Sequence, residues 1–304
     1  MKKIFFLFAI VMMSTTVALT SCDSSEDIVS ESVQDLPDAE LTRLYNSIDS
    51  LHNEYSTPGV TRGATLDKWG RRFLVATFDA CAGAITAETG PGAFICSTIA
   101  SGLYDDYLDA VDRRFSRAHN SNTRSSSITP QSVVFPSATP CFVDSIGYYH
   151  NLVINEIQSK GQSFIDVNGN IDYNSYYNEV LKISKENGIS CNVAINKPLV
   201  FRYINSIIKP FAQIENGNEE TILSIIFNGT YNDFNYDDSK TLQLRNVCKK
   251  IIYNDLSVNE NQVVEYGTKV NELIVKSNVA NDTKETMKVA NNIAVNSSLY
   301  WSSN

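Results

Sequence analysis

Apolar residues recur at every third or fourth position along most of this chain, which is the spacing of amphipathic helices. The pattern is clearest from 37 to 55, where leucine, isoleucine and tyrosine alternate with charged groups. Pro37 and Asp38 suit the first turn of a helix, and Pro58-Gly59 suits its end. Because no segment shows a convincing run of alternating strand residues, we expect a mainly α, multi-helix fold.

Caps and apolar spacing predict further helices in the second half of the chain. One is expected to start at Asp144, and a second to start at Asp172 or Asn174 and end at Gly188. Four more are expected over 219–227, 238–255, 257–276 and 281–294. Ser257 and Glu260 have the spacing of a capping box, which would open the helix 257–276. The final segment, IAVNSSLYWSSN, is expected to extend as a short edge.

The segment 70–104 is rich in Ala, Gly, Ser, Thr and Cys, and Gly90-Pro91-Gly92 interrupts it near its middle. We expect a helical hairpin whose small side chains let two backbones approach closely. Cys81 and Cys96 lie on opposite arms and are a candidate disulfide pair. Because polar, aperiodic residues follow, the expected plan is N-terminal helices over 37–117, a linker over 118–132 and a C-terminal helical domain over 133–304.

The first residues have the features of a signal peptide. Lys2 and Lys3 give a positive start, and the apolar stretch 4–17 is too short for a mature membrane-spanning helix. The following residues, LTSC at 19–22, resemble the lipobox of bacterial lipoproteins. The resemblance implies removal of 1–21 and acylation of Cys22, with palmitate as the typical chain. Acyl chains contribute about 0.8 kcal/mol per buried methylene, so two or three of them would hold the protein at a membrane.

Acidic and serine residues follow the lipobox cysteine directly. The sequence DSSED at 23–27 resembles the surface-export signal of Bacteroidota lipoproteins. The same composition predicts a flexible, solvated tether over 22–36, because it cannot bury enough apolar surface to fold. Both interpretations place the protein in the cell envelope as an outer-membrane lipoprotein, facing either the periplasm or the cell surface.

The charge balance excludes some classes of partner. The chain has 34 acidic and 25 basic residues, a formal net charge of −9 at pH 7, and loss of 1–21 removes two lysines. Nucleic acids and anionic lipid surfaces attract clustered Lys and Arg, so we expect no nucleic-acid partner and no electrostatic membrane binding. The expected partners are the membrane, through the acyl anchor, and an unknown envelope or extracellular molecule.

Cysteine and histidine give little sign of a metal site. The chain has six cysteines, and acylation of Cys22 would leave five. Because five is an odd number, at most two disulfides can form and one thiol stays free. No Cys-X-X-Cys pair and no cysteine–histidine cluster occurs, so no zinc site is expected. Among the three histidines, His52 adjoins an apolar stripe, His119 lies in the linker, and His150 is expected to be a hydrogen-bonded core residue.

Two acidic motifs resemble cation sites incompletely. Asp105, Asp109 and Asp112 share a helical face and resemble the DDxxD motif of terpene synthases, but the second metal motif of those enzymes is missing. A solvated face is therefore favoured, and a metal-dependent enzyme that uses this face is the alternative. The segment 166–172 resembles a calcium loop, but Ile171 replaces its glycine and Tyr177 stands in place of the bidentate glutamate.

No motif nominates a catalytic residue or a cofactor, since the chain has no GxSxG, no HExxH and no complete glycine-rich phosphate loop. The leading hypothesis is a non-enzymatic binding or interaction module, and a membrane-active protein that uses the 70–104 hairpin is a further alternative. The small-residue segment after Trp69, His150-Asn151 on a helix and NSSLYW at 296–301 resemble features of uncharacterised Bacteroidota envelope lipoproteins, which implies no activity. Ser50 and Ser145 fit the Asp-Ser-apolar pattern of O-glycosylation in that phylum.

Overall fold

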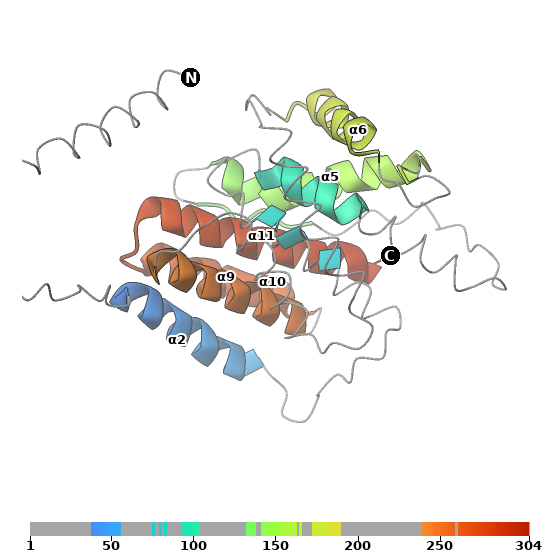
Figure 1. Ribbon diagram of the computed structural model, residues 1–304. Coiled ribbons are helices and arrows are strands. Elements are labelled where there is room, and N and C mark those ends of the chain that lie inside the picture. Colours follow the sequence, from blue (N-terminus) through green and yellow to red (C-terminus); the bar gives the residue numbers. More distant parts are fainter. Residues whose placement is uncertain are drawn as a thin grey trace, which may run out of the picture. The chain divides into compact units, whose positions relative to one another are not determined.

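Helices make up most of the chain that the computed structural model describes (Figure 1). The described residues are 38–55, 75–76, 79–80, 82–83, 93–103, 132–137, 141–162, 164–165, 172–189, 239–258 and 261–303. The chain divides into two units, 1–36 and 37–304, and all described residues belong to the second. The elements are α2 (Ala39–Tyr55), η2 (Phe142–Ser145), α5 (Ile146–Ser159), α6 (Tyr173–Glu186), α9 (Ser239–Ser257), α10 (Val263–Lys276) and α11 (Asn281–Ser303). No β-strand runs through these ranges, so the prediction of a mainly α domain is confirmed.

The helix α11 is the centre of this unit. It contacts α5, α9, α10 and the short turn η2, and in Figure 1 its red ribbon lies between α5 and the α9–α10 pair. From Met287 to Trp301 every side chain except that of Ser298 is buried. The helix α2 packs against α9 and α10, and α6 packs against α5.

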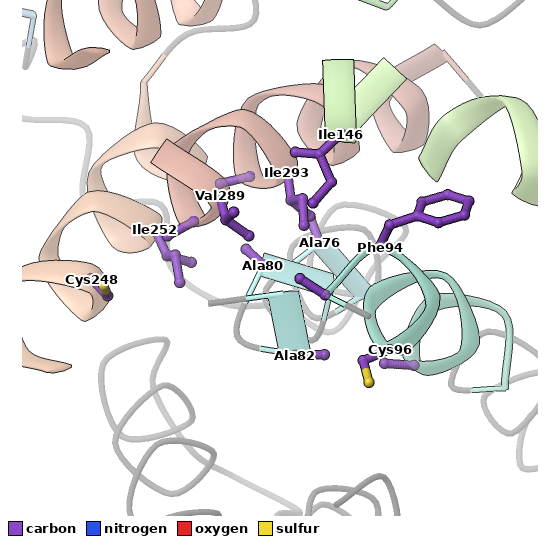
Figure 2. Close-up of a cluster of buried hydrophobic side chains, with 14 of the residues drawn as sticks. Ala76, Ala80, Ala82, Phe94, Cys96, Ile146, Cys248, Ile252, Val289 and Ile293 are labelled. Carbon is purple, nitrogen blue, oxygen red and sulfur yellow. The ribbon is translucent and has the colours of Figure 1, made fainter. Parts of the chain in front are cut away.

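Small side chains let the described parts of the segment 70–104 pack closely on the central helix. These parts are helical, and their side chains share one core with α5, α9 and α11 (Figure 2). A Cβ atom added to Gly83 would come within 2.2 Å of Ile293 Cδ1, and one added to Gly102 within 1.6 Å of the Tyr176 hydroxyl. The expected helical content is thus observed, while the turn of the hairpin lies outside the described residues.

Buried asparagine side chains of α11 form hydrogen bonds with backbone N–H and C=O groups of neighbouring segments. Asn296 Nδ2 donates to the Val133 carbonyl at 3.0 Å, and the Val133 N–H donates to Asn296 Oδ1 at 2.8 Å. One turn earlier, Asn292 Nδ2 donates to the Val143 carbonyl at 2.8 Å, and its Oδ1 accepts from Asn271 Nδ2 at 2.7 Å. These bonds satisfy polar groups that the core would otherwise leave unpaired, which is why asparagine can occupy a buried helix.

The predictions for α2, α6 and α9 are confirmed to within a few residues. Asp172 is the N-cap of α6, and its Oδ1 accepts from the Ser175 N–H at 3.0 Å. Gly188 follows the helix with a positive φ of 67°, a conformation that a residue without Cβ adopts at little cost.

Two predicted boundaries in the C-terminal region are wrong. Helix α9 runs through Ser257, which therefore opens no capping box, and α10 begins at Val263 after Gln262, whose side chain makes no cap bond. The reason is burial of Val258, whose N–H bonds to the Asn254 carbonyl at 3.1 Å and continues the helical turn. The final segment does not form the predicted extended edge: the helix does not stop at Ala294, because burial of Leu299, Tyr300 and Trp301 continues α11 to Ser303.

Asp144 does not cap α5 as predicted. Ser145 occupies that position, and the Asp144 carboxylate accepts hydrogen bonds from the Cys141 N–H at 3.0 Å and from Lys288 Nζ at 2.8 Å. Burial favours the protonated form, but hydrogen bonds from Lys288 and Ser137 outweigh it and lower the pKa of Asp144 to about 2. This buried ion pair ties η2 to α11.

Candidate functional site

A pocket of about 500 Å³ lies between α2 and α9. Its lining combines apolar, polar and aromatic side chains: Leu41, Thr42 and Tyr45 of α2, and Gln243, Asn246, Val247, Lys249, Lys250 and Tyr253 of α9. Leu41 and Val247 are buried, whereas Thr42 and Asn246 are exposed. Its volume lies within the range of small-molecule sites.

The two helices run in the same direction along this pocket. The backbone N–H of Asp38, just before α2, donates to Gln243 Oε1 near the start of α9 at 2.6 Å. Further along both helices, Asp49 forms an ion pair with Lys250. Because the helices are parallel, their N-terminal ends lie at the same end of the pocket, and both helix dipoles favour negative charge there.

The lining residues include two lysines and no carboxylate. The Lys250 ammonium lies 5.6 Å from the centroid of the Tyr45 ring, a cation–π distance, and also forms an ion pair with Asp49. An ammonium has three N–H donors, so it can bind a further acceptor in the pocket. The pocket therefore offers positive charge, amide groups and aromatic rings on a protein with net negative charge.

A second polar group lies in the interior, centred on the Asp79 carboxylate. Asp79 Oδ2 accepts a hydrogen bond from the Ser297 hydroxyl and lies 3.3 Å from Trp301 Nε1 and 3.5 Å from His150 Nε2. All four side chains are buried, so none can meet a substrate from solution. The serine hydroxyl donates to the aspartate and not to the histidine, so the group lacks the hydrogen bond that activates a serine nucleophile.

The environment of His150 favours the neutral ring. Burial lowers the pKa of His150 to about 4, although hydrogen bonds to the Asn151 side chain and the Ser97 carbonyl act in the opposite direction. Its Nδ1 lies 3.0 Å from Asn151 Oδ1. The prediction of a hydrogen-bonded core histidine is therefore confirmed.

A third polar group joins α2, α9 and α10. Asp255 is fully buried, and within the described part of the chain neither of its carboxyl oxygens has a hydrogen-bond partner. Burial raises the pKa of Asp255 well above its ordinary value, and burial and the Asp255 charge raise that of Tyr266. The His52 ring lies 6.0 Å from the Tyr266 ring, edge to face. Asp255 and Tyr266 are closed to solvent, His52 is partly buried, and the group packs the three helices together.

Most of the residues that the sequence nominated are not among those that the structure describes. Cys22, Cys81, His119, the acidic face of Asp105, Asp109 and Asp112, and the loop 166–171 lie outside the described residues, so lipidation, the disulfide and both cation sites stay predictions. Cys96 is buried in the helical segment 93–103. Ser50 is exposed on α2, whereas Ser145 is partly buried. Within the described ranges no group of three or more His, Cys, Asp or Glu side chains could hold a metal ion.

Sequence reasoning missed the α2–α9 pocket. Each contributing residue looks like an ordinary core-facing or exposed position of an amphipathic helix, and the two helices are almost two hundred residues apart in the chain. The only local signal is the pair Lys249-Lys250 beside Tyr253, which is a cationic and aromatic cluster in an acidic protein.

Comparison with known proteins adds no assignment: no family model, no curated protein and no solved structure matches this chain. Among the described helices, none is both long enough and apolar enough to cross a membrane.

Proposed function

We propose that this protein is a lipid-anchored component of the cell envelope that binds a small molecule in the α2–α9 pocket without transforming it. The pocket is the observation that carries the proposal, because it brings two lysines, two tyrosines and two side-chain amides together with two buried apolar side chains. The anchor rests on the lipobox ending at Cys22, and an unknown envelope or extracellular molecule is the expected partner.

The interior polar groups support a binding role more than a catalytic one. Asp79, His150 and Ser297 are fully buried, and Asp255 is buried as well. Catalytic acids and bases must come within hydrogen-bond reach of a substrate, which these side chains cannot do from the core. The pocket itself offers no carboxylate, histidine or cysteine among its lining residues.

The anchor is tested by fractionating cells that produce the wild-type chain or Cys22→Ser. We expect the wild type in the membrane fraction and the variant released with soluble envelope proteins. Protease added to intact cells then separates the two possible faces, since only a surface-exposed protein is degraded before lysis. Equal membrane association of both chains would contradict the lipid anchor.

The binding role is tested by thermal unfolding of the purified mature protein against a broad library of small polar molecules. Asn246→Trp fills the mouth of the pocket from an exposed position, so it leaves the core intact. We expect at least one compound to raise the unfolding temperature of the wild type and not that of the variant. A library without such a compound, or stabilisation that survives Asn246→Trp, would contradict the proposal.

A further inference from the structure

We infer that the ligand of the α2–α9 pocket is a sugar that carries an acidic group, either a carboxylate or a phosphate. This inference rests on the proposed function, because it assigns a chemical class to the molecule that the same pocket binds. Three properties of the lining lead to it: ring faces, amide donors and positive charge.

The aromatic rings come from Tyr45 and Tyr253, which stand on different helices and are both partly buried against the core; the Lys250 ammonium already lies over one face of the Tyr45 ring. An aromatic ring offers an apolar face and a polar edge at low entropic cost, because it has few rotatable bonds. The C–H face of a sugar ring packs on such a surface, while its hydroxyl groups stay free to form hydrogen bonds at the edges.

The amide donors come from Gln243 and Asn246. Gln243 Oε1 already accepts from the Asp38 N–H, which fixes the side chain and leaves its NH₂ group as a donor. Asn246 is exposed and carries both a donor and an acceptor at the rim. Together with the Thr42 hydroxyl, these groups match the mixed donors and acceptors of sugar hydroxyls.

The positive charge comes from Lys249 and Lys250; no carboxylate is among the lining residues, although Asp49, outside the lining, pairs with Lys250 and offsets part of its charge. This pair attracts an anionic group and repels cationic ligands, and the parallel N-terminal ends of α2 and α9 act in the same direction. The net charge of −9 on the whole chain opposes long polyanions such as nucleic acids. A small molecule with one acidic group satisfies both conditions.

The test is a ligand-observed NMR titration of the purified mature protein with four probes: glucuronate, glucose 6-phosphate, glucose and inorganic phosphate. The first two carry both ring and charge, the third only the ring and the fourth only the charge. We expect dissociation constants on the order of 1 mM for the acidic sugars, which suits ligands of this size. Glucose and phosphate should each bind at least about tenfold more weakly, because each loses one set of contacts.

Three variants assign the contacts. Lys249→Gln and Lys250→Gln should each weaken the acidic sugars about tenfold and change glucose binding much less, since glutamine can still donate a hydrogen bond to a hydroxyl but cannot attract an anion. The ion pair of Lys250 with Asp49 is partly exposed, so its loss should leave the fold intact. Lys182→Gln, an exposed lysine of α6, is the matched control and should change no affinity.

Each outcome decides the inference. Preferential binding of one acidic sugar over the other identifies the acidic group and supports the inference. Equal binding of glucose and glucuronate, equal binding of phosphate and glucose 6-phosphate, or no binding of either acidic sugar up to about 50 mM would overturn it. If the acidic sugars fail while a library compound is still lost on Asn246→Trp, the ligand class is wrong and the binding function stands.

Discussion

The buried Asn296 side chain offers a sharp test of how α11 holds the fold together. Its amide makes three hydrogen bonds: two with the backbone of Val133 and one to the Asn292 carbonyl at 2.8 Å. Asn296→Ala removes all three and leaves the N–H and C=O of Val133 without these partners. We therefore expect a loss of unfolding free energy.

The magnitude follows from the exposure of the groups left behind. An unsatisfied buried polar group costs about 1–3 kcal/mol, and Val133 is only partly buried, so water can restore some of its bonds. We expect Asn296→Ala to cost about 2–4 kcal/mol, a large part of the 5–15 kcal/mol that stabilises a typical domain. Asn296→Asp should cost at least as much, because its second oxygen would face the carbonyl oxygens of Val133 and Asn292.

The assay is urea unfolding of the purified protein followed by far-UV circular dichroism. The matched control is Asn178→Ala on α6, where an exposed asparagine in mid-helix is replaced, and this change should stay within about 0.5 kcal/mol. If Asn296→Ala were as stable as the control, the hydrogen bonds between α11 and the segment 132–137 would contribute nothing, and the reasoning would be refuted.

Three other predictions concern pH, packing and modification. Burial lowers the pKa of His150 from 6.5 in the unfolded chain to about 4 in the folded protein. As pH falls, His150 therefore binds a proton in the unfolded state before it does so in the folded state, which favours unfolding. The free energy of unfolding should drop by about 2 kcal/mol from pH 7 to 5 through this residue. Urea midpoints should show a smaller pH dependence for His150→Gln, and an unchanged dependence would contradict this. Gly147→Ala puts a Cβ 2.2 Å from the Asn292 carbonyl oxygen and should lower the free energy of unfolding by several kcal/mol. The control, Gly161→Ala, meets open space at φ 61° and should lower it by about 1 kcal/mol. Equal urea midpoints for the two variants would refute the close packing at Gly147. If the chain is O-glycosylated, peptide mass spectrometry should find the glycan on exposed Ser50 and not on partly buried Ser145, and the reverse pattern would be inconsistent with modification of the folded protein.

The sequence was sufficient to predict helices whose polar residues face water. The helix α2 has an apolar stripe with charges on its other side, and α6 starts at an aspartate and ends at a glycine, so local rules describe both. The C-terminal part of α11 breaks those rules. Its asparagines and serines suggest turns, but Asn292, Asn296 and Ser297 are buried and bonded to distant segments, and only the tertiary structure supplies those partners.

The candidate site could not be predicted for a similar reason. Lys250 and Tyr45 are unremarkable in their own helices, and their contact depends on α2 and α9 lying parallel. The interior position of His150 was predictable, because aromatic and apolar residues surround it in the sequence. Its proximity to Asp79 and Ser297 was not, since those residues come from parts of the chain that meet only in the fold.

Hydrogen–deuterium exchange of the mature protein, with and without saturating glucuronate, tests the central claim most directly. Binding in the pocket should slow exchange in 41–45 of α2 and 243–253 of α9, and leave α6 unchanged. Asn246→Trp should abolish this protection while keeping the exchange pattern of the unliganded protein. Protection confined to other helices, or no change in α2 and α9 at saturation, would contradict a ligand site between these two helices.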